Sequence, residues 1–414
     1  MPYKESNNSK LTCSFCQRSR RDVAKLVVSQ NVSICNICID MVHDLLHKDV
    51  DEPALDKKVS LKVPSPVTVK ELLDLRVIGQ EQAKIALSVA VHNHYKRILK
   101  KGKTQIEKSN VLILGGTGTG KTLMAKTIAE FLDVPFVVGD ATTLTQTGYV
   151  GDDVESLLSR LVQAADGDFE RAEHGIVFID EVDKLASKME SNNGGRDISG
   201  EGVQQALLKM LEGSKVEVQL NSSRKLAGTD EATIDTTNIL FICSGAFVGM
   251  DKVIQKNRGA AIGFNGKPDK RVIDLGTVTP QDIVKYGLIP ELVGRLPVLT
   301  HTNNLTKDDL VRVLTEPENS LITQYQHLFE PVKLLFSDDA LEELAERALK
   351  DNTGARGLRG QLDKILTPLQ FKLHTEKLKS VVSILVNRET ITGVGEPLYT
   401  YKRAGTKAKN EKTQ

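Results

Sequence analysis

The sequence contains no tryptophan, and aromatic residues make up only 4% of its 414 residues, although 40% are hydrophobic. It has no apolar run that approaches the length of a membrane span. Its first ten residues, MPYKESNNSK, lack the apolar segment of a signal peptide. These absences argue against a membrane or secreted protein, so we expect a cytoplasmic protein with room for two or three domains.

An excess of charge of one sign is also lacking. Lys and Arg number 55 and Asp and Glu number 54, which gives a net charge of +1. A balanced chain has no overall attraction to phosphate backbones or to anionic lipid surfaces. We therefore expect neither a nucleic-acid partner nor a membrane partner.

Cysteine is scarce, but four of the five cysteines form two C-x₂-C pairs, at Cys13, Cys16, Cys35 and Cys38. Two such pairs at this separation are typical of a four-thiolate zinc site. Two disulfides are the alternative, which a reducing cytosol disfavours. Because four thiolates leave no open coordination position, we expect the zinc to be structural. Cys243, in the apolar run NILFIC, is most simply a core residue.

The most informative motif is VLILGGTGTGKT, from Val111 to Thr122. Its first four residues are typical of a buried parallel strand, and a helix is expected to begin at Lys121. A strand, a glycine-rich turn and a helix in this order are the context of the phosphate-binding loop G-x-x-x-x-G-K-[ST]. The amides of the turn and the positive end of the helix dipole would face phosphate oxygens. The sequence therefore predicts that the chain binds a nucleoside triphosphate.

Two motifs together predict hydrolysis. Lys121 is expected to reach the β- and γ-phosphates, and Thr122 to take one position on Mg²⁺. GIVFIDEVDK predicts a buried strand over 176–179 that ends in Asp180 and Glu181, at the sheet edge where parallel strands bind ligands. Asp180 is then suited to partner Mg²⁺ and Glu181 to polarise the attacking water. A catalytic glutamate indicates a hydrolase rather than a static nucleotide binder.

Helical patterns frame these motifs. T-x-x-E at Thr68 and Glu71 predicts a capping box that opens a helix, and a second helix is expected from Gln80 to about Leu99. Apolar residues recur with helical spacing over 337–350. Arg356, in GARGLR, lies near the start of a further helix, a position that disfavours a cation and so suggests a nearby anion.

Three segments leave alternatives open. GYVG, at 148–151, is either a mobile loop that exposes apolar surface or a turn with a buried tyrosine. The glycine-rich segment 257–269 carries the triplet Ile262–Phe264, which either folds back onto the body or docks on a partner. Arg295 either caps carbonyl groups or acts as an arginine finger on the γ-phosphate of a neighbouring subunit.

The sequence resembles the ClpX family of ATP-dependent AAA+ protein unfoldases in the order and spacing of seven motifs. They are the Cys₄ pairs, GGTGTGKT, GYVG, VFIDEVDK, IGF, GLIPELVGRLP and GARGLR. The resemblance covers about residues 10–370. It implies an α/β fold: a AAA+ P-loop NTPase, with a parallel sheet sandwiched by helices, a small C-terminal α-rich domain and an N-terminal Cys₄ zinc module. The implied boundaries are a zinc module at 1–50, a linker at 51–66, a large ATPase domain at 67–302, a small domain at 303–395 and a basic, disordered tail at 396–414.

The resemblance also implies ATP, Mg²⁺ and Zn²⁺ as cofactors, and roles for matching residues. The nucleotide with its Mg²⁺ would be held by Val77, Ile78, Gly116, Thr117, Gly118, Thr119, Gly120, Lys121, Thr122, Asp180 and Arg356. Hydrolysis would use Lys121, Glu181, the sensor Arg356 and, in trans, Arg295. Tyr149 and Val150 would grip substrate in a central pore, and RDISGEG, at 196–202, resembles the second pore loop. Ile262, Gly263 and Phe264 would dock on the ClpP peptidase ring.

The implied activity is ATP-dependent protein unfolding. A homohexamer would thread substrate polypeptides through its pore and deliver them to ClpP, without being a peptidase itself. The zinc module would dimerise and receive adaptor proteins.

The sequence departs from the family pattern in the segment that follows GARGLR and at three earlier places. Gly116 replaces a proline that is usual in the family, and Ser244 stands where glycine is common, without an assigned role. An Arg-Lys-His loop at the pore entrance appears as Arg224, Lys225 and Leu226, which predicts a different tag preference because a titratable ring is lost.

Other functions remain open from sequence. A stand-alone remodelling chaperone would need the same ATPase without a peptidase. A P-loop motor on nucleic acid would need basic pore loops, which the charge balance does not supply. A nucleotide-binding scaffold without turnover would not need Glu181 and Arg295. A relative of HslU would lack the N-terminal Cys₄ module.

Overall fold

The structure, a computed structural model, describes residues 12–20, 22–28, 32–39, 41, 63–100, 106–145, 152–186, 198–219, 231–257, 275–351, 353–373 and 380–402. The chain divides into two compact units between Ser60 and Leu61. Among the described residues, no helix is both long and apolar enough to cross a membrane.

The N-terminal unit is small. Strands β1 (Leu26–Val28) and β2 (Ser33–Cys35) pair antiparallel, with Leu26 opposite Cys35. Its buried cluster consists of three cysteines, against which Val23, Leu26 and Ile34 pack. With so few apolar side chains packed among its described residues, this unit depends on whatever the cysteines bind.

The second unit is built on a five-stranded parallel sheet in the order β11-β3-β10-β7-β4. Its strands are β3 (Val111–Leu114), β4 (Phe136–Asp140), β7 (Ile176–Asp180), β10 (Leu240–Gly245) and β11 (Val298–His301). Strands covered on both faces read as continuous apolar runs. This is why VLIL and IVFI were recognisable in the sequence, and both strands occupy the expected residues.

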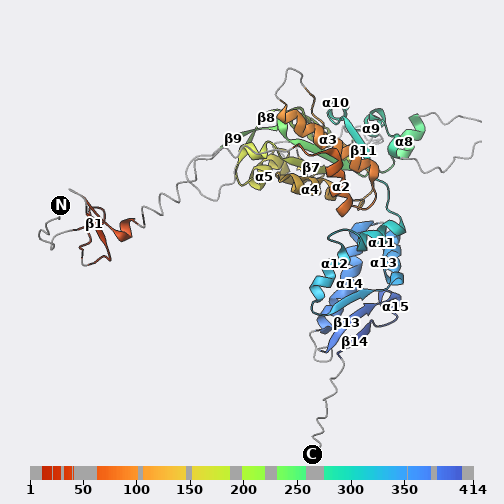
Figure 1. The fold of residues 1–414 in the computed structure, drawn as a ribbon. Coiled ribbons are helices and arrows are strands. Elements are labelled where there is room, and N and C mark those ends of the chain that lie inside the picture. Colours follow the sequence, from red (N-terminus) through yellow and green to blue (C-terminus); the bar gives the residue numbers. More distant parts are fainter. Residues whose placement is uncertain are drawn as a thin grey trace, which may run out of the picture. The chain divides into compact units, whose positions relative to one another are not determined.

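Helices cover both faces of this sheet (Figure 1). The alternate side chains Val111, Ile113, Ile176, Phe178, Leu240 and Ile242 pack with α2 (Pro66–Arg76), α3 (Glu81–Leu99) and α4 (Lys121–Leu132). The intervening side chains face α5 (Ser156–Ala164), α7 (Ile198–Glu212), α8 (Met250–Asn257), α9 (Pro280–Tyr286) and α10 (Pro290–Gly294). The predicted α/β fold with a sandwiched parallel sheet is therefore confirmed.

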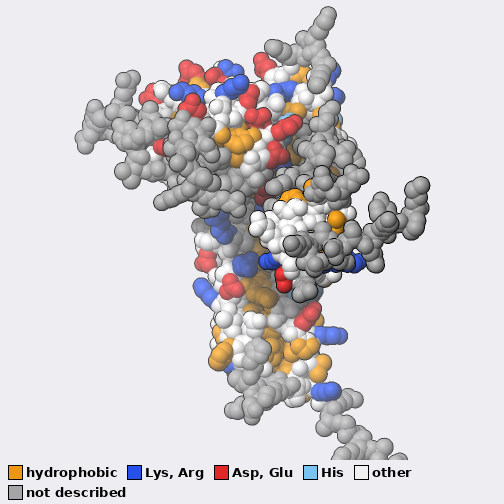
Figure 2. Space-filling model, turned by 90° about the vertical axis from the view of Figure 1, so that its left-hand side faces the viewer, with side chains coloured by type: hydrophobic (Ala, Val, Ile, Leu, Met, Phe, Trp, Pro, Cys, Tyr) orange, Lys and Arg blue, Asp and Glu red, His pale blue; other side chains and the backbone are white. Residues whose placement is uncertain are grey.

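Short elements connect this framework. They are β5 (Leu144–Thr145), β6 (Asp152–Asp153), α6 (Phe169–Ala172), the hairpin β8 (Lys215–Gln219) and β9 (Glu231–Asp235), and the 3₁₀ turns η1 (Val182–Leu185), η2 (Thr236–Asn238) and η3 (Leu275–Thr277). On the face shown in Figure 2, basic and acidic side chains are interspersed rather than gathered by sign.

The C-terminal part has its own buried cluster. Its helices are α11 (Lys307–Thr315), α12 (Leu321–Phe329), α13 (Asp338–Lys350), α14 (Ala355–Leu373) and α15 (Arg388–Thr392). They pack with a three-stranded sheet of β12 (Lys333–Phe336), β13 (Val381–Val386) and β14 (Leu398–Tyr401). The predicted helix over 337–350 is present, with Ser337 as its N-cap.

Two expectations were wrong. The helix after the linker does not open at a Thr68 capping box: α2 begins at Pro66, and the Ser65 hydroxyl accepts a hydrogen bond from the Val67 amide. The expected tail from 396 is ordered at its start, because β14 pairs antiparallel with β13. A proline at the first helical position explains the first case, since it has no amide to satisfy.

Candidate functional site

The phosphate loop joins β3 to α4, as its sequence predicts. Gly115, Gly118 and Gly120 adopt φ values of 147°, 76° and 97°. A side chain at Gly118 would also lie 2.6 Å from the carbonyl oxygen of Thr353. The loop therefore needs glycine at 118 for both its backbone conformation and the space beside it.

A cavity of about 1030 Å³ opens beside this loop. From the loop and α4 it is lined by Thr117, Gly118, Gly120, Lys121 and Thr122, and from the end of β7 by Asp180, Glu181 and Asp183. From the C-terminal part, the lining includes Ala355 and Arg356 and a group around the start of α12, namely Asn319, Ser320, Thr323 and Gln324. The sequence-predicted phosphate, acidic and sensor residues thus surround one cavity large enough for a nucleotide.

Lys121 is buried and bends back onto the loop. Its Nζ donates to the carbonyl oxygens of Gly115 and Gly116, each at 2.8 Å. Burial lowers the pKa of Lys121, while the carboxylates of Asp180 and Asp183 oppose that shift. These two bonds are replaceable by phosphate oxygens, which also accept charge-assisted hydrogen bonds.

The acidic end of the cavity is built at the last residue of β7. Glu181 has a left-handed backbone, with φ 59°. Its amide donates to Asp180 Oδ1 at 2.9 Å. A left-handed backbone at a residue other than glycine costs about 1–3 kcal/mol and is concentrated at functional sites. The conformation points to a constrained role for Glu181.

Magnesium fits this end of the cavity. Mg²⁺ prefers oxygen ligands and takes only one or two from the protein in nucleotide sites. Thr122 supplies a hydroxyl and Asp180 a carboxylate, and both line the cavity. Asp180 Oδ2 accepts no hydrogen bond from any residue that the structure describes, so it is available to a cation or its waters.

Not every predicted nucleotide residue lines the cavity. Val77 and Ile78 are buried, with 4% and 7% of their surfaces exposed. Val77 Cγ1 lies 3.4 Å from the position that a Cβ would occupy at Gly120, so Val77 supports the phosphate loop closely. Thr119 donates to Gly116 and exchanges a 2.7 Å hydrogen bond with Thr302, inside the loop. Val77 and Thr119 therefore support the loop, and none of Val77, Ile78, Gly116 and Thr119 is part of the cavity lining.

Arg356 and Arg295 occupy different environments. Arg356 is the second residue of α14 and lines the cavity; the adjacent Ala355 amide donates to the Gly118 carbonyl at 3.3 Å. Arg295 follows α10 and lies outside the cavity lining, half exposed, with a guanidinium nitrogen 2.8 Å from Glu212 Oε1. Arg356 is therefore placed to meet a nucleotide of its own chain, whereas Arg295 is accessible from outside.

Two polar residues that the sequence analysis missed organise this region. Asp183 is buried, and its carboxylate accepts from the amides of Ala246 and Phe247 at 3.2 and 3.1 Å. Asp183 was visible in the sequence as a third acid after the strand, in IDEVD. No local pattern distinguishes it from a solvated residue.

The second missed residue is Asn110, which precedes β3 and is 1% exposed. Its side-chain nitrogen donates to the carbonyls of Leu211, at 3.3 Å, and Arg295, at 3.0 Å. Its Oδ1 accepts from the Phe241 amide at 3.3 Å. A single asparagine therefore joins α7, α10, β3 and β10.

Several predicted positions lie outside the described residues. They are Tyr149 and Val150, Ile262, Gly263 and Phe264, and Arg224, Lys225 and Leu226. Their assignments stay predictions.

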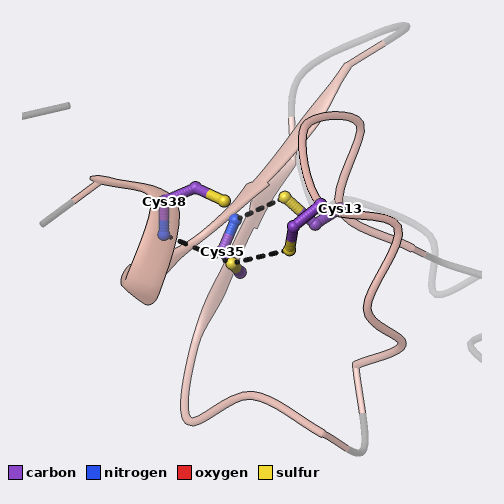
Figure 3. Close-up of side chains that lie close together, drawn as sticks. Cys13, Cys35 and Cys38 are labelled. Atoms are coloured by element: carbon purple, nitrogen blue, oxygen red, sulfur yellow. Dashed lines mark hydrogen bonds between the residues drawn. The ribbon is translucent and has the colours of Figure 1, made fainter. Parts of the chain in front are cut away.

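The four cysteines of the N-terminal unit form one cluster, in which the sulfur atoms all lie within 4.8 Å of one another. Figure 3 shows Cys13, Cys35 and Cys38, from a loop, from β2 and from the helical residues 36–39 that follow it, with their side chains converging. The Cys35 amide donates to Cys13 Sγ at 3.3 Å, and the Cys38 amide to Cys35 Sγ at 3.4 Å. Amides directed at sulfur are suited to thiolates, and four converging thiolates fit tetrahedral zinc.

The cluster needs a cation for charge reasons as well. Burial opposes ionisation of Cys13, but the amides of Cys16, Cys35 and Phe15 outweigh it and lower the pKa of Cys13 to about 6. Burial and the neighbouring sulfurs raise the pKa of Cys38 to about 12. Thiols packed this closely do not all ionise unless a metal compensates their charge.

Comparison with known proteins agrees with both sites. Residues 11–48 match the ClpX C4-type zinc finger, residues 106–299 match the AAA domain (Cdc48 subfamily), and residues 305–386 match the C-terminal, D2-small domain, of ClpB protein. The zinc finger with its four cysteines and the AAA+ ATPase domain give Zn²⁺, ATP and Mg²⁺ as the cofactors.

Curated relatives match nearly the whole chain. The ATP-dependent Clp protease ATP-binding subunit ClpX of Borrelia duttonii is 45% identical over 398 residues, which cover 93% of this chain and 92% of the relative. The protein of the same name from Treponema denticola is 46% identical over 393 residues, which cover 92% and 94%. The chain therefore belongs to the ClpX family of AAA+ ATPases.

Proposed function

We propose that this protein is an ATP-dependent unfoldase that threads polypeptides through a homohexameric pore and delivers them to a ClpP peptidase ring. The observation that carries the proposal is the single cavity shared by Lys121, Asp180, Glu181 and Arg356. The names of the relatives, ATP-binding subunits of an ATP-dependent protease, support the partner.

Each side chain has a distinct part in the proposed hydrolysis. Lys121 leaves the loop carbonyls and binds the β- and γ-phosphates, while Thr122 and Asp180 hold Mg²⁺. The bound ion supplies charge neutralisation on those phosphates. Glu181, fixed by its left-handed backbone, accepts the proton of the attacking water. Arg356 contacts the nucleotide from α14 and reports its state to the C-terminal part.

The position of Arg295 supports a ring. It is exposed and pairs only weakly, through a surface contact, with Glu212. An arginine finger supplied by a neighbouring subunit completes the charge stabilisation of the γ-phosphate. Each site is then incomplete in a monomer, and we propose the homohexamer of the resemblance as the active form.

The remaining assignments rest on the resemblance. Tyr149 and Val150 grip substrate in the pore, and Ile262, Gly263 and Phe264 dock on ClpP. We keep the proposed division into a zinc module, a large ATPase domain and a small domain at the boundaries given above. The zinc unit exposes large apolar side chains, Phe15, Val27, Val28, Ile37 and Met41, which supports its proposed dimerisation and adaptor binding. Four metal-binding thiolates also support a reducing cytoplasm as the location.

The test is unfolding of a stable, degron-tagged fluorescent protein with ATP, with and without ClpP. The wild type is expected to remove the fluorescence, and to release peptides only when ClpP is present. Glu181→Gln should do neither. Glu170→Gln serves as the matched control, because Glu170 is exposed on α6 and outside the cavity lining.

The outcomes separate the alternatives. Unfolding that ClpP never converts to peptide release would identify a stand-alone remodelling chaperone. ATP hydrolysis without any unfolding of the tagged protein would overturn the unfoldase assignment for this substrate class and point to Leu226 as a source of a different tag preference.

A further inference from the structure

Ser244 lies beside Asp180, a residue of the cavity lining, on the neighbouring strand. It is the fifth residue of β10 and is fully buried. In the neighbouring strand β7, Ile179 lies opposite Cys243, so Ser244 comes level with Asp180. The Ser244 hydroxyl donates a hydrogen bond of 2.5 Å to Asp180 Oδ1.

This bond divides the two oxygens of the Asp180 carboxylate. Oδ1 accepts from both the Ser244 hydroxyl and the Glu181 amide. Oδ2 accepts from no described residue, while Asp180 itself lines the cavity. Two donors on one oxygen fix the rotation of the carboxyl group, so the other oxygen is the one presented to the cavity.

We propose that Ser244 is a positioning residue for divalent-cation binding: it holds Asp180 so that Oδ2 is presented to Mg²⁺, which lowers the Mg²⁺ concentration needed for nucleotide binding. The inference rests on the proposed role of Asp180. Ser244 stands where glycine is common in the family that the sequence resembles. The strand can therefore form without a side chain at this position.

The alternative is that Ser244 donates to Asp180 only because a buried hydroxyl needs a partner. Ser88 argues that this need is not absolute, because its hydroxyl is buried without a hydrogen-bond partner among the described residues. Mutation of a group that hydrogen-bonds to a metal ligand typically lowers metal affinity or activity by about 10- to 100-fold. A serine with a merely structural role would leave the Mg²⁺ dependence unchanged.

The experiment is an Mg²⁺ titration of the full-length chain, with binding of a fluorescent, non-hydrolysable ATP analogue as the readout. Ser244→Gly and Ser244→Ala should raise the half-saturating Mg²⁺ concentration about tenfold. At saturating Mg²⁺ both variants should still bind the analogue. Ser88→Ala, the matched loss of a buried hydroxyl, should leave the half-saturating concentration unchanged. Thermal unfolding without nucleotide checks that all variants are folded at the assay temperature.

Asp180→Asn separates the two hypotheses. If it raises the Mg²⁺ requirement but the Ser244 variants do not, the Ser244 inference is wrong and the role of Asp180 stands. If Asp180→Asn also leaves the requirement unchanged, the proposed magnesium role of Asp180 fails first.

Discussion

Removing zinc should unfold the N-terminal unit and leave the ATPase unit folded. The perturbation is a zinc-selective chelator applied to the nucleotide-free chain, or the substitution Cys38→Ser. Cys38 is one of the four clustered thiols, and its amide also donates to Cys35 Sγ.

The magnitude follows from how little else holds this unit together. Among the residues that the structure describes, only Val23, Leu26 and Ile34 pack against the buried cysteines, each of them partly exposed. Even full burial would give about 1.5–3 kcal/mol each, and so less than about 9 kcal/mol together. Structural zinc in small modules contributes about 10–16 kcal/mol at neutral pH. The metal is therefore the largest single source of stability in this unit.

Hydrogen exchange read by mass spectrometry gives the assay, with zinc content measured on the same samples. Peptides within 12–41 should lose protection when zinc is removed, whereas peptides that contain β3 or β10 should keep it. Cys243→Ala is the matched control, because Cys243 is buried in the sheet and should not change the zinc content. Two results would refute the reasoning: protection of 12–41 that survives proven loss of zinc, or loss of protection in β3 and β10.

Three further predictions test the second unit. Arg295→Ala should lower ATP turnover by at least about 1,000-fold while binding of the ATP analogue persists. Glu212→Gln removes only the surface partner of Arg295 and should leave turnover unchanged. Equal turnover of the wild type and Arg295→Ala would exclude the arginine finger. Lys84→Met should lower the free energy of unfolding in urea by about 2 kcal/mol, because the buried ammonium donates to Asp74 and to the Val77 carbonyl; an unchanged midpoint would contradict this. Burial lowers the pKa of Lys108 to about 7. Since the unfolded chain then binds more protons above that pH, the stability of the wild type relative to Lys108→Met should rise by about 2 kcal/mol from pH 7 to 9 in urea titrations. A flat difference would refute this.

The elements around the phosphate loop were predictable because their signals are local. The apolar run at 111–114, the glycines and Lys121 are adjacent in sequence, and they fix where β3 ends and α4 begins. The buried strand ending at Asp180 was predictable for the same reason, since α/β strands covered on both faces carry a continuous apolar run.

Contacts between distant segments were not predictable in this way. The hydrogen bond from Ser244 to Asp180 depends on β10 lying next to β7, and the order of strands in a sheet leaves no local signal. The sequence predicts a disordered tail from residue 396, whereas residues 398–401 form β14 by pairing with β13, a contact that leaves no local signal in four residues. Val77 has the apolar side chain expected of a residue that contacts adenine. In the structure it packs against the phosphate loop at Gly120 and does not line the cavity.

Asn110 gives the proposed ring a further property. Its side-chain amide donates to the carbonyl of Arg295, and Asn110 directly precedes β3, the strand from which the phosphate loop extends. If Arg295 completes the site of a neighbouring subunit, Asn110 connects two functional parts of one subunit. These are the phosphate loop, which binds the subunit's own nucleotide, and Arg295, which acts on the nucleotide of the neighbour. A change in the phosphate loop would then reach Arg295, and through it the adjacent subunit, along the four residues of β3 and one hydrogen bond. Neighbouring sites in such a ring would be unable to work independently.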